Sequence, residues 1–254
     1  MPVSATDPLA PLLRLANVES AFGQARTAVD EALRHRALRR HGGAVATEAA
    51  LRSARASAAL EGNDHPLDEV RAGTVTDPVV QGALRVSEAL PGLADRWSKA
   101  PLQVLARLHV LAARGVAPEE ELGRPYGSPL SPGEVSGRLD GLAQLVAGGT
   151  TAPALLVAAV VHGEVLAVRP FQTGNGVVAR AAARLTLIDR GLDPRGLVVP
   201  EAGHLARRPE YVGAAGAYAT GTPDGLRSWF GHCASAVRLG AAETTDIADR
   251  VIAS

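Results

Sequence analysis

The sequence predicts an all-α, mostly helical protein, and two observations carry this prediction. Alanine, leucine and arginine recur at helical spacing through most of the 254 residues. Alternating runs of β-branched residues, which would indicate half-buried strands, are almost absent. We therefore expect a scaffold of helices joined by short connections rich in proline and glycine.

Helical periodicity divides the chain into successive amphipathic or apolar segments. Proline and glycine mark their ends most clearly at residues 61–66, 123–129 and 168–176. The residues before the first of these connections form an expected N-terminal helical region, 1–64, and the rest form the core, 65–254. The expected helices are 17–40, 44–61, 76–90, 101–114, 132–147, 153–168, 175–190, 208–219 and 223–252.

Charge and cysteine content exclude several classes of protein. Lys+Arg and Asp+Glu both number 26, so no net field draws the chain to nucleic acid or to an acidic membrane, and neither partner is expected. The single cysteine, Cys233, excludes an internal disulfide and a multi-cysteine zinc site, and we expect its thiol to be buried. Without a leader or an apolar run of about 20 residues, the expected location is the cytoplasm.

A locally basic run, Arg34 to His41, departs from this neutral average. A solvated helix face is one explanation of such a run. A patch for RNA or for an acidic partner is the alternative.

The loop at residues 169–180 has the composition of an anion-binding site. Gly174 and Gly176 lack side chains, so backbone N–H groups can approach a ligand, and the helix that follows points its unpaired N-terminal donors at the same place. Asn175 is placed to cap this helix or to donate to a phosphate, and Arg180 lies one turn inside, within reach of a bound triphosphate.

The same loop resembles the signature of the Fic family of nucleotide-dependent transferases, His-Pro-Phe-x-acid-Gly-Asn-Gly-Arg-x-x-Arg. The resemblance covers roughly residues 50–240 and implies a Fic-like helical domain with the motif loop between two core helices. It also implies transfer of AMP from ATP to a hydroxyl group of a protein target. The matching residues are Pro170, Phe171, Gly174, Asn175, Gly176 and Arg180.

Three polar positions of that signature are changed. Arg169 stands at the catalytic histidine, and because arginine stays protonated it cannot act as the general base, a loss of about 10²- to 10⁴-fold in rate. Thr173 stands at the acidic metal-binding position and is a poor ligand for Mg²⁺. Val177 replaces the first arginine. AMP transfer is therefore expected to be impaired, and Mg²⁺ is not expected as a cofactor.

Two interpretations of Arg169 remain open at this stage. Its guanidinium can pair with phosphate oxygens in place of a metal, which would allow metal-free binding of ATP or another nucleotide, or a different transfer chemistry. Alternatively, it forms only a surface or capping ion pair in a decayed site.

A second element, Ser57-Ala-Ala-Leu-Glu61-Gly62, resembles the inhibitory motif that some Fic proteins carry on a helix before the core. The resemblance implies that Glu61 pairs with Arg180 at the place of the nucleotide γ-phosphate. Because removing one partner of a buried pair costs about 3–5 kcal/mol, retention for structure alone is the alternative.

The remaining candidates have structural interpretations. The target-docking flap, residues 124–132, is short and reduced, so docking by strand addition is not expected. His162 precedes Arg169 by seven residues, or about 10.5 Å along a helix. This is too far to replace the base, and we expect a half-buried histidine bonded to the backbone. His109 and His232 are expected to be packing residues rather than zinc ligands.

Three functions follow from these residues. The first is a degenerate Fic protein that binds a nucleotide or phosphate ligand at the 169–180 loop and acts as a regulator or interaction module. The second is an active transferase, resembling a protein adenylyltransferase, that uses Arg169 electrostatically. The third is an interaction scaffold whose pocket is sealed by Glu61. The expected partner is a protein target or regulator, and the resemblance suggests a homodimer.

Overall fold

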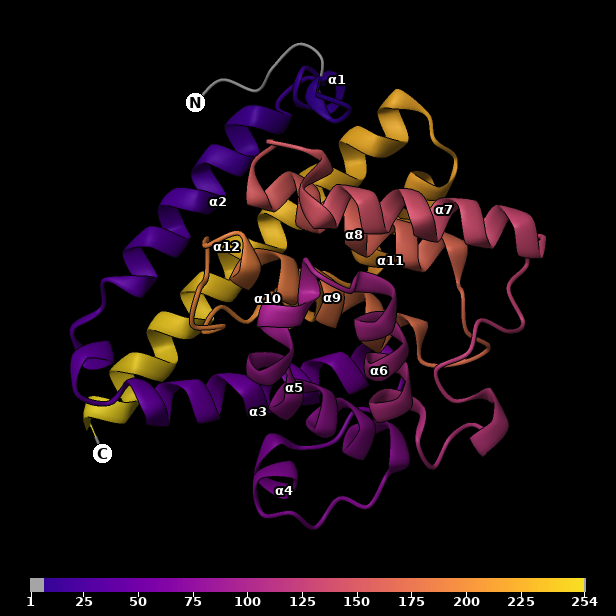
Figure 1. Cartoon of the computed structure of the whole chain (residues 1–254). Coiled ribbons are helices and arrows are strands. Elements are labelled where there is room, and N and C mark those ends of the chain that lie inside the picture. Colours follow the sequence, from indigo (N-terminus) through magenta and orange to yellow (C-terminus); the bar gives the residue numbers. More distant parts are fainter. Residues whose placement is uncertain (1–6, 254) are drawn as a thin grey trace.

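The computed structural model describes residues 7–253 and confirms the all-α prediction (Figure 1). Between residues 7 and 253 there is no β-strand, and one isolated bridge joins Arg114 to Ala117. The helical elements are α1 (Ala10–Leu13), α2 (Val18–Leu33), η1 (Arg36–Arg39), α3 (Gly42–Leu60), α4 (Leu67–Arg71), α5 (Pro78–Trp97), α6 (Pro101–Ala113), η2 (Glu119–Glu121), α7 (Pro132–Gln144), η3 (Leu145–Gly149), α8 (Ala154–Val168), α9 (Asn175–Asp189), α10 (Pro200–Ala206), α11 (Arg208–Ala219) and α12 (Pro223–Ala253).

Helices α8 and α9 form the centre of the fold. Helix α8 is apolar on nearly all sides, the pattern of a helix surrounded by protein, and α9 packs along it. Helices α2, α11 and α12 cover α8, and α5 and α6 lie against α9. Trp229 of α12 is fully buried beside α8, where its Nε1–H donates to the Ala159 carbonyl at 2.8 Å. The motif loop is therefore held between the two most enclosed helices.

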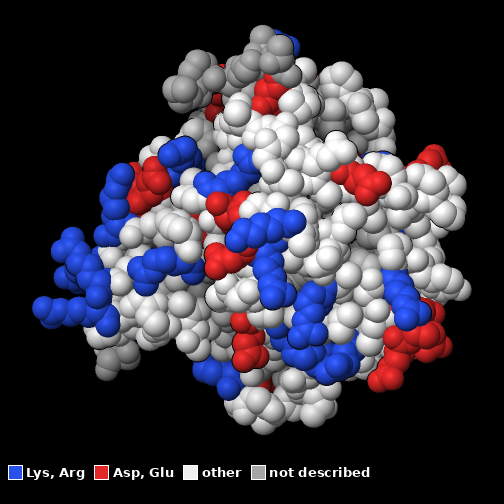
Figure 2. Space-filling model, in the orientation of Figure 1, with Lys and Arg blue, Asp and Glu red and all other residues white. Residues whose placement is uncertain are grey.

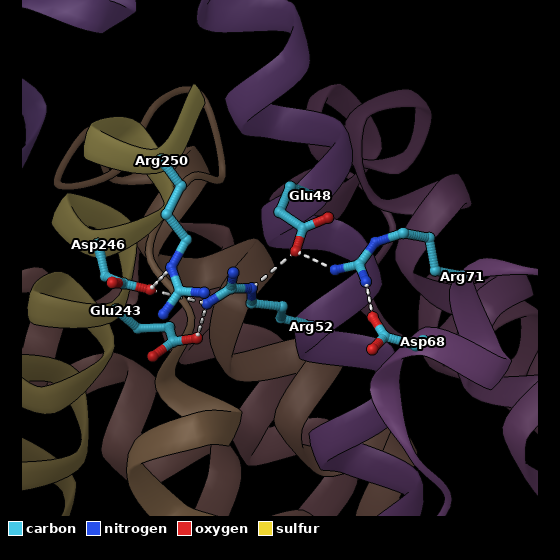
Figure 3. A network of polar contacts seen from close by, with 7 residues as sticks. All are labelled: Glu48, Arg52, Asp68, Arg71, Glu243, Asp246 and Arg250. Carbon is cyan, nitrogen blue, oxygen red and sulfur yellow. Dashed lines mark hydrogen bonds and ion pairs between the residues drawn. The ribbon is translucent and has the colours of Figure 1, made fainter. Parts of the chain in front are cut away.

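A network of ion pairs fixes helix α3 against α12 and α4 (Figure 3). Arg52 at its centre donates to Glu48 at 2.8 Å and to Glu243 at 2.6 Å. Arg71 of α4 donates to the same Glu48 carboxylate at 2.6 Å. Burial opposes the charge of Arg52, yet its hydrogen bonds to these carboxylates raise its pKa above the ordinary value. The network positions the helix that carries the inhibitory-like motif.

Two of the expected helices have different bounds in the structure. The prediction of one continuous helix over 17–40 is wrong, because α2 ends at Leu33 and His35 adopts an extended backbone conformation. The Nδ1 atom of His35 then accepts from Ala37 N–H and begins the 3₁₀ turn η1. The helix expected over 76–90 continues through Pro91 to Trp97.

The N-terminal region contributes to the main core. Val18 and Phe22 of α2 and Ala54 and Ala58 of α3 belong to the same hydrophobic cluster as α8 and α9. The division into 1–64 and 65–254 stays a prediction, and its terminal residues 1–6 and 254 lie outside the described part of the chain. Cys233 is buried, as predicted. Over residues 7–253, no helix combines the length and the apolar character that crossing a membrane requires.

Candidate functional site

The motif loop is held in shape by its own side chains. Helix α8 ends at Val168, the following Arg169 has a φ of 47° in the left-handed region, and Gly174 with φ 71° precedes α9. The Asn175 side chain accepts from Phe171 N–H at 3.0 Å and donates to the Phe171 carbonyl. Phe171 in turn stacks on His109 with ring centroids 3.9 Å apart. Asn175 therefore closes the loop, and its amide neither caps α9 nor points freely at a ligand.

His109 supports this loop from below, in agreement with the packing role predicted for it. It is 1% exposed, and its Nδ1 atom accepts from Gly123 N–H at 2.9 Å. Burial lowers its pKa, so the ring is neutral and apolar enough to stack on Phe171. Helix α6 thus supplies, through His109, the ring against which Phe171 packs.

Arg180 is the most enclosed charge of the site. Its guanidinium donates to Ser57 Oγ and to the Ser57 carbonyl, both at 3.0 Å, and to Tyr211 Oη at 3.2 Å. It also donates to Glu61 Oε1 at 2.7 Å. Burial opposes its charge, but Tyr211 and Glu61 raise the pKa of Arg180 above its ordinary value. The predicted contact between Glu61 and Arg180 is present, with Ser57 as a further acceptor.

The Glu61 carboxylate lies directly against the N-terminus of α9. A Cβ atom built on Gly176 would come within 2.1 Å of Glu61 Oε1, so a side chain at this position would displace the carboxylate. No acceptor among residues 7–253 bonds the backbone N–H groups of Asn175, Gly176 and Val177. A carboxylate at this helix end is favoured by these donors and by the helix dipole. Glu61 therefore occupies the position of an anion.

A cavity of about 660 Å³ opens above this pair. Glu61 and Arg180 lie in it together with Arg169, Thr173 and Val177, the three positions that depart from the signature. Apolar residues of α5, α6, α8 and α11 line one part of the cavity, among them Val79, Ala112, Ala113, Leu166 and Val212. Val116, which follows α6, joins them.

Arg169 is exposed in this cavity. Of the carboxylates in the described part of the chain, none comes within ion-pair distance of its guanidinium, so the surface or capping ion pair weighed for Arg169 is not observed. Its left-handed backbone and its exposure leave a positive charge at the mouth of the site.

The cavity does not provide a set of metal ligands. Its one carboxylate, Glu61, is bonded to Arg180, and Thr173 offers a neutral hydroxyl. Within residues 7–253 there is no group of three His, Cys, Asp or Glu side chains that could hold a metal ion. Hard cations such as Mg²⁺ need several oxygen ligands, so these side chains do not fit one.

Tyr211 was not singled out from the sequence as a site residue. It comes from α11, and its hydroxyl bridges Arg180 to His162 Nε2, which lies 2.9 Å away. The prediction that His162 is half-buried and bonded to the backbone is wrong: it is 2% exposed and bonds a side chain. The signal for Tyr211 is weak, since nothing local sets it apart from Tyr218 on the same helix, and its partners lie on distant helices.

Behind Tyr211 lies a buried histidine cluster formed by His162, His204 and His232. His232 is a packing residue as predicted, but it is not isolated, because its Nε2 atom lies 3.0 Å from His204 Nδ1. Burial lowers the pKa of all three histidines, that of His232 to about 4, and Arg180 opposes protonation of His162 and His204. The three rings are therefore neutral near pH 7.

The histidine cluster makes the protein less stable in mild acid. Below pH 6.5 the unfolded chain binds protons at these histidines while the folded chain does not. The free energy of unfolding should therefore fall by roughly 1.4 kcal/mol per pH unit for each histidine kept neutral, as pH decreases from about 6.5 toward 4. Urea unfolding between pH 7 and 5 measures this slope. The His232→Gln variant should show a slope smaller by roughly 1.4 kcal/mol per pH unit, because one of the three histidines is removed. A slope near zero in the wild-type protein would contradict the neutral state of the three buried histidines.

The flap segment lies against the motif loop. Tyr126 N–H donates to the Pro170 carbonyl at 2.8 Å, and Ser128 Oγ donates to the Val168 carbonyl at 2.6 Å. These two contacts join the segment to the motif loop, and it contains no strand, in keeping with the reduced flap that the sequence predicts. An apolar cavity of about 590 Å³, which includes Tyr126 and Leu102, adjoins it on the side of α7.

Comparison with known proteins adds a likeness at the level of fold. No protein-family model matches the chain, and none of the curated proteins matches it. The crystal structure of a Fic family protein from Desulfovibrio desulfuricans G20 is similar, with a TM-score of 0.70 and 21% identity over 89% of this chain and 74% of that chain.

Two structures of Fic-1 from C. elegans are also similar. One has a TM-score of 0.70 and 20% identity, covering 99% of this chain and 80% of that chain. The other, a Glu-to-Gly variant, has a TM-score of 0.72 and 20% identity over 96% and 78%. The order of helices, the loop between α8 and α9 and these likenesses agree, and the chain therefore has the fold of the Fic proteins.

Proposed function

We propose that this protein binds a nucleotide at the 169–180 loop and acts as a regulator or interaction module, with AMP transfer impaired. A cavity of about 660 Å³ is large enough for a nucleotide, because small-molecule sites span about 300–1,000 Å³. Its apolar walls suit a base and a sugar, and its polar groups gather around the N-terminus of α9. These features support a phosphate-bearing ligand.

The observation that carries the proposal is the prior orientation of Arg180. The Arg180 guanidinium donates three hydrogen bonds to Ser57 and Tyr211, so it keeps its place whether or not Glu61 is present. It is 3% exposed, and it faces the same space as the free N–H groups of α9. A phosphate that replaced the Glu61 carboxylate would bind a guanidinium group that is already in position, so no free energy is lost in reorienting it.

Arg169 supports binding without a metal. It lines the same cavity as Arg180 and has no carboxylate partner in the described chain, so its charge is available to an anion bound there. Arginine forms bidentate hydrogen bonds with phosphate oxygens. Its positive charge can therefore balance the negative charge of the phosphates, which Mg²⁺ usually does. The same substitution removes the base that proton transfer from a target hydroxyl requires.

Titration calorimetry with ATP, with and without Mg²⁺, tests this function. Wild-type protein should bind weakly, and Glu61→Gly should bind more tightly by roughly tenfold or more. It removes a competing carboxylate whose charge-assisted bond is worth about 1.5–3 kcal/mol. Arg180→Met, which keeps the buried stem but not the charge, should abolish the heat of binding. Mg²⁺ should change the affinity little.

Matched variants separate charge from shape. The Glu61→Gln variant keeps the size of the side chain and an oxygen that accepts from Arg180. If its affinity for ATP lies between those of wild type and Glu61→Gly, part of the effect of Glu61 is due to its charge. Titrations with GTP and CDP-choline identify the preferred base. No heat with any nucleotide, in a Glu61→Gly variant that circular dichroism shows to be folded, would reject nucleotide binding and favour the scaffold with a sealed pocket.

A further inference from the structure

The turn between α2 and α3 displays a concentration of unpaired positive charge. Its arginines are exposed, and no carboxylate of the described residues lies within ion-pair distance of them. A further arginine joins them from the loop before α10, with its guanidinium against Gly42 at the start of α3. We call these residues the arginine cluster: Arg34, Arg36, Arg39, Arg40 and Arg195.

The fold of the turn places these charges close together. Residues 36–39 form the 3₁₀ helix η1, in which side chains three positions apart are eclipsed. Arg36 and Arg39 therefore project from the same side, about 6 Å apart along the axis. In Figure 2, blue side chains project from the left edge of the molecule, where Figure 1 places the end of α2 and the turn into α3.

The neighbouring charges leave this cluster uncompensated. The Asp249 carboxylate near the turn is bonded to His35 at 3.1 Å. The last turn of α2 carries two acids, of which Asp30 pairs with Arg26 and Glu31 forms no ion pair with the cluster. The contrast with the network of Figure 3 is clear, since Arg52 and Arg71 there are matched by carboxylates of the same protein. Exposed like charges at this separation repel one another, so an anionic partner lowers their energy.

We propose that the arginine cluster is a docking surface for an acidic segment of a partner protein. Guanidinium groups pair with carboxylates through two parallel hydrogen bonds, and a peptide rich in glutamate or aspartate offers such groups at short intervals. Single-stranded nucleic acid fits less well, because it relies on aromatic side chains for base stacking. Of the phenylalanine, tryptophan and tyrosine residues, all of which are described, only Tyr126 is exposed, and it lies on the flap rather than in the cluster.

Fluorescence anisotropy with labelled octaglutamate tests the docking surface. The full chain should bind the peptide saturably at low salt, and affinity should fall as salt screens the charges. Arg36→Glu together with Arg39→Glu should weaken binding by roughly tenfold or more, because two charge-assisted contacts are lost. Arg36→Gln with Arg39→Gln should show a smaller loss in the same direction without introducing repulsion.

The matched control is Arg107→Glu together with Arg124→Glu. These two arginines are also exposed and unpaired among the described residues, lie on other elements and give the same change in net charge. They should leave the affinity for octaglutamate nearly unchanged. Equal weakening by both pairs, or no binding by wild type, would overturn the docking surface. Tighter binding of labelled octathymidylate through Arg36 and Arg39 would assign the cluster to nucleic acid instead.

Discussion

Replacing Arg169 with histidine should accelerate transfer of AMP from ATP to a hydroxyl group of the protein or of water, with release of pyrophosphate, by roughly 10²- to 10⁴-fold, the usual contribution of a positioned general base that accepts the hydroxyl proton. The comparison requires a background of Glu61→Gly and Thr173→Asp, which opens the anion position and supplies a carboxylate for Mg²⁺. Position 169 has φ 47°, and histidine is one of the residues that enter the left-handed region more readily than most. The new imidazole should therefore keep the path of the loop.

Arg169→Ala in the same background is the control for this gain. It removes the guanidinium without adding a base, so its rate should stay near that of the background. The histidine variant should also gain activity as pH rises through about 6.5, where imidazole loses its proton. Equal rates for the alanine and histidine variants, both well above the background, would show that Arg169 only obstructs the site. A background rate within tenfold of the histidine variant would favour an active transferase that needs no histidine.

Trp229→Ala should lower the free energy of unfolding by about 3–5 kcal/mol, the cost of removing a large buried aromatic side chain. Trp229 is 0% exposed and lies 4.9 Å from the His162 ring, centroid to centroid. The change also leaves the Ala159 carbonyl without the indole N–H that it now accepts. Urea unfolding at pH 7 measures the loss.

Trp229→Phe separates the two contributions to this loss. Phenylalanine restores part of the ring but not the donor, so its cost should lie between those of wild type and Trp229→Ala. A loss below about 1 kcal/mol for the alanine variant would contradict the central position of Trp229, because complete burial of a tryptophan implies a much larger penalty.

The sequence predicts those parts of the fold that depend on local signals. The helices expected over 44–61, 153–168 and 175–190 match α3, α8 and α9 within about two residues, because proline and glycine end each of them. The short helix α10 was missed. Gly203 and Gly240 allow close backbone contact between α12 and the segment of α10, and no pattern in the neighbouring sequence predicts such a close approach of two helices.

The candidate site divides in the same way. The loop 169–180 and its glycines can be recognised from the sequence, since they lie within one short segment. That Arg169 stands in place of a base and Thr173 in place of an acid follows from the resemblance of this segment to the Fic signature. A contact between Glu61 and Arg180 could be expected only through a resemblance, because 119 residues separate them.

Tertiary structure alone decided what surrounds Arg180. Tyr211 of α11 accepts from Arg180, and His162 of α8 bonds Tyr211 in turn. The exposed, unpaired state of Arg169 depends on which carboxylates the fold brings near. The sequence determined which chemical groups the loop carries, because composition is local. Their protonation, partners and enclosure were decided by the packing of distant helices, because burial and electrostatic interactions depend on distances in space rather than along the chain.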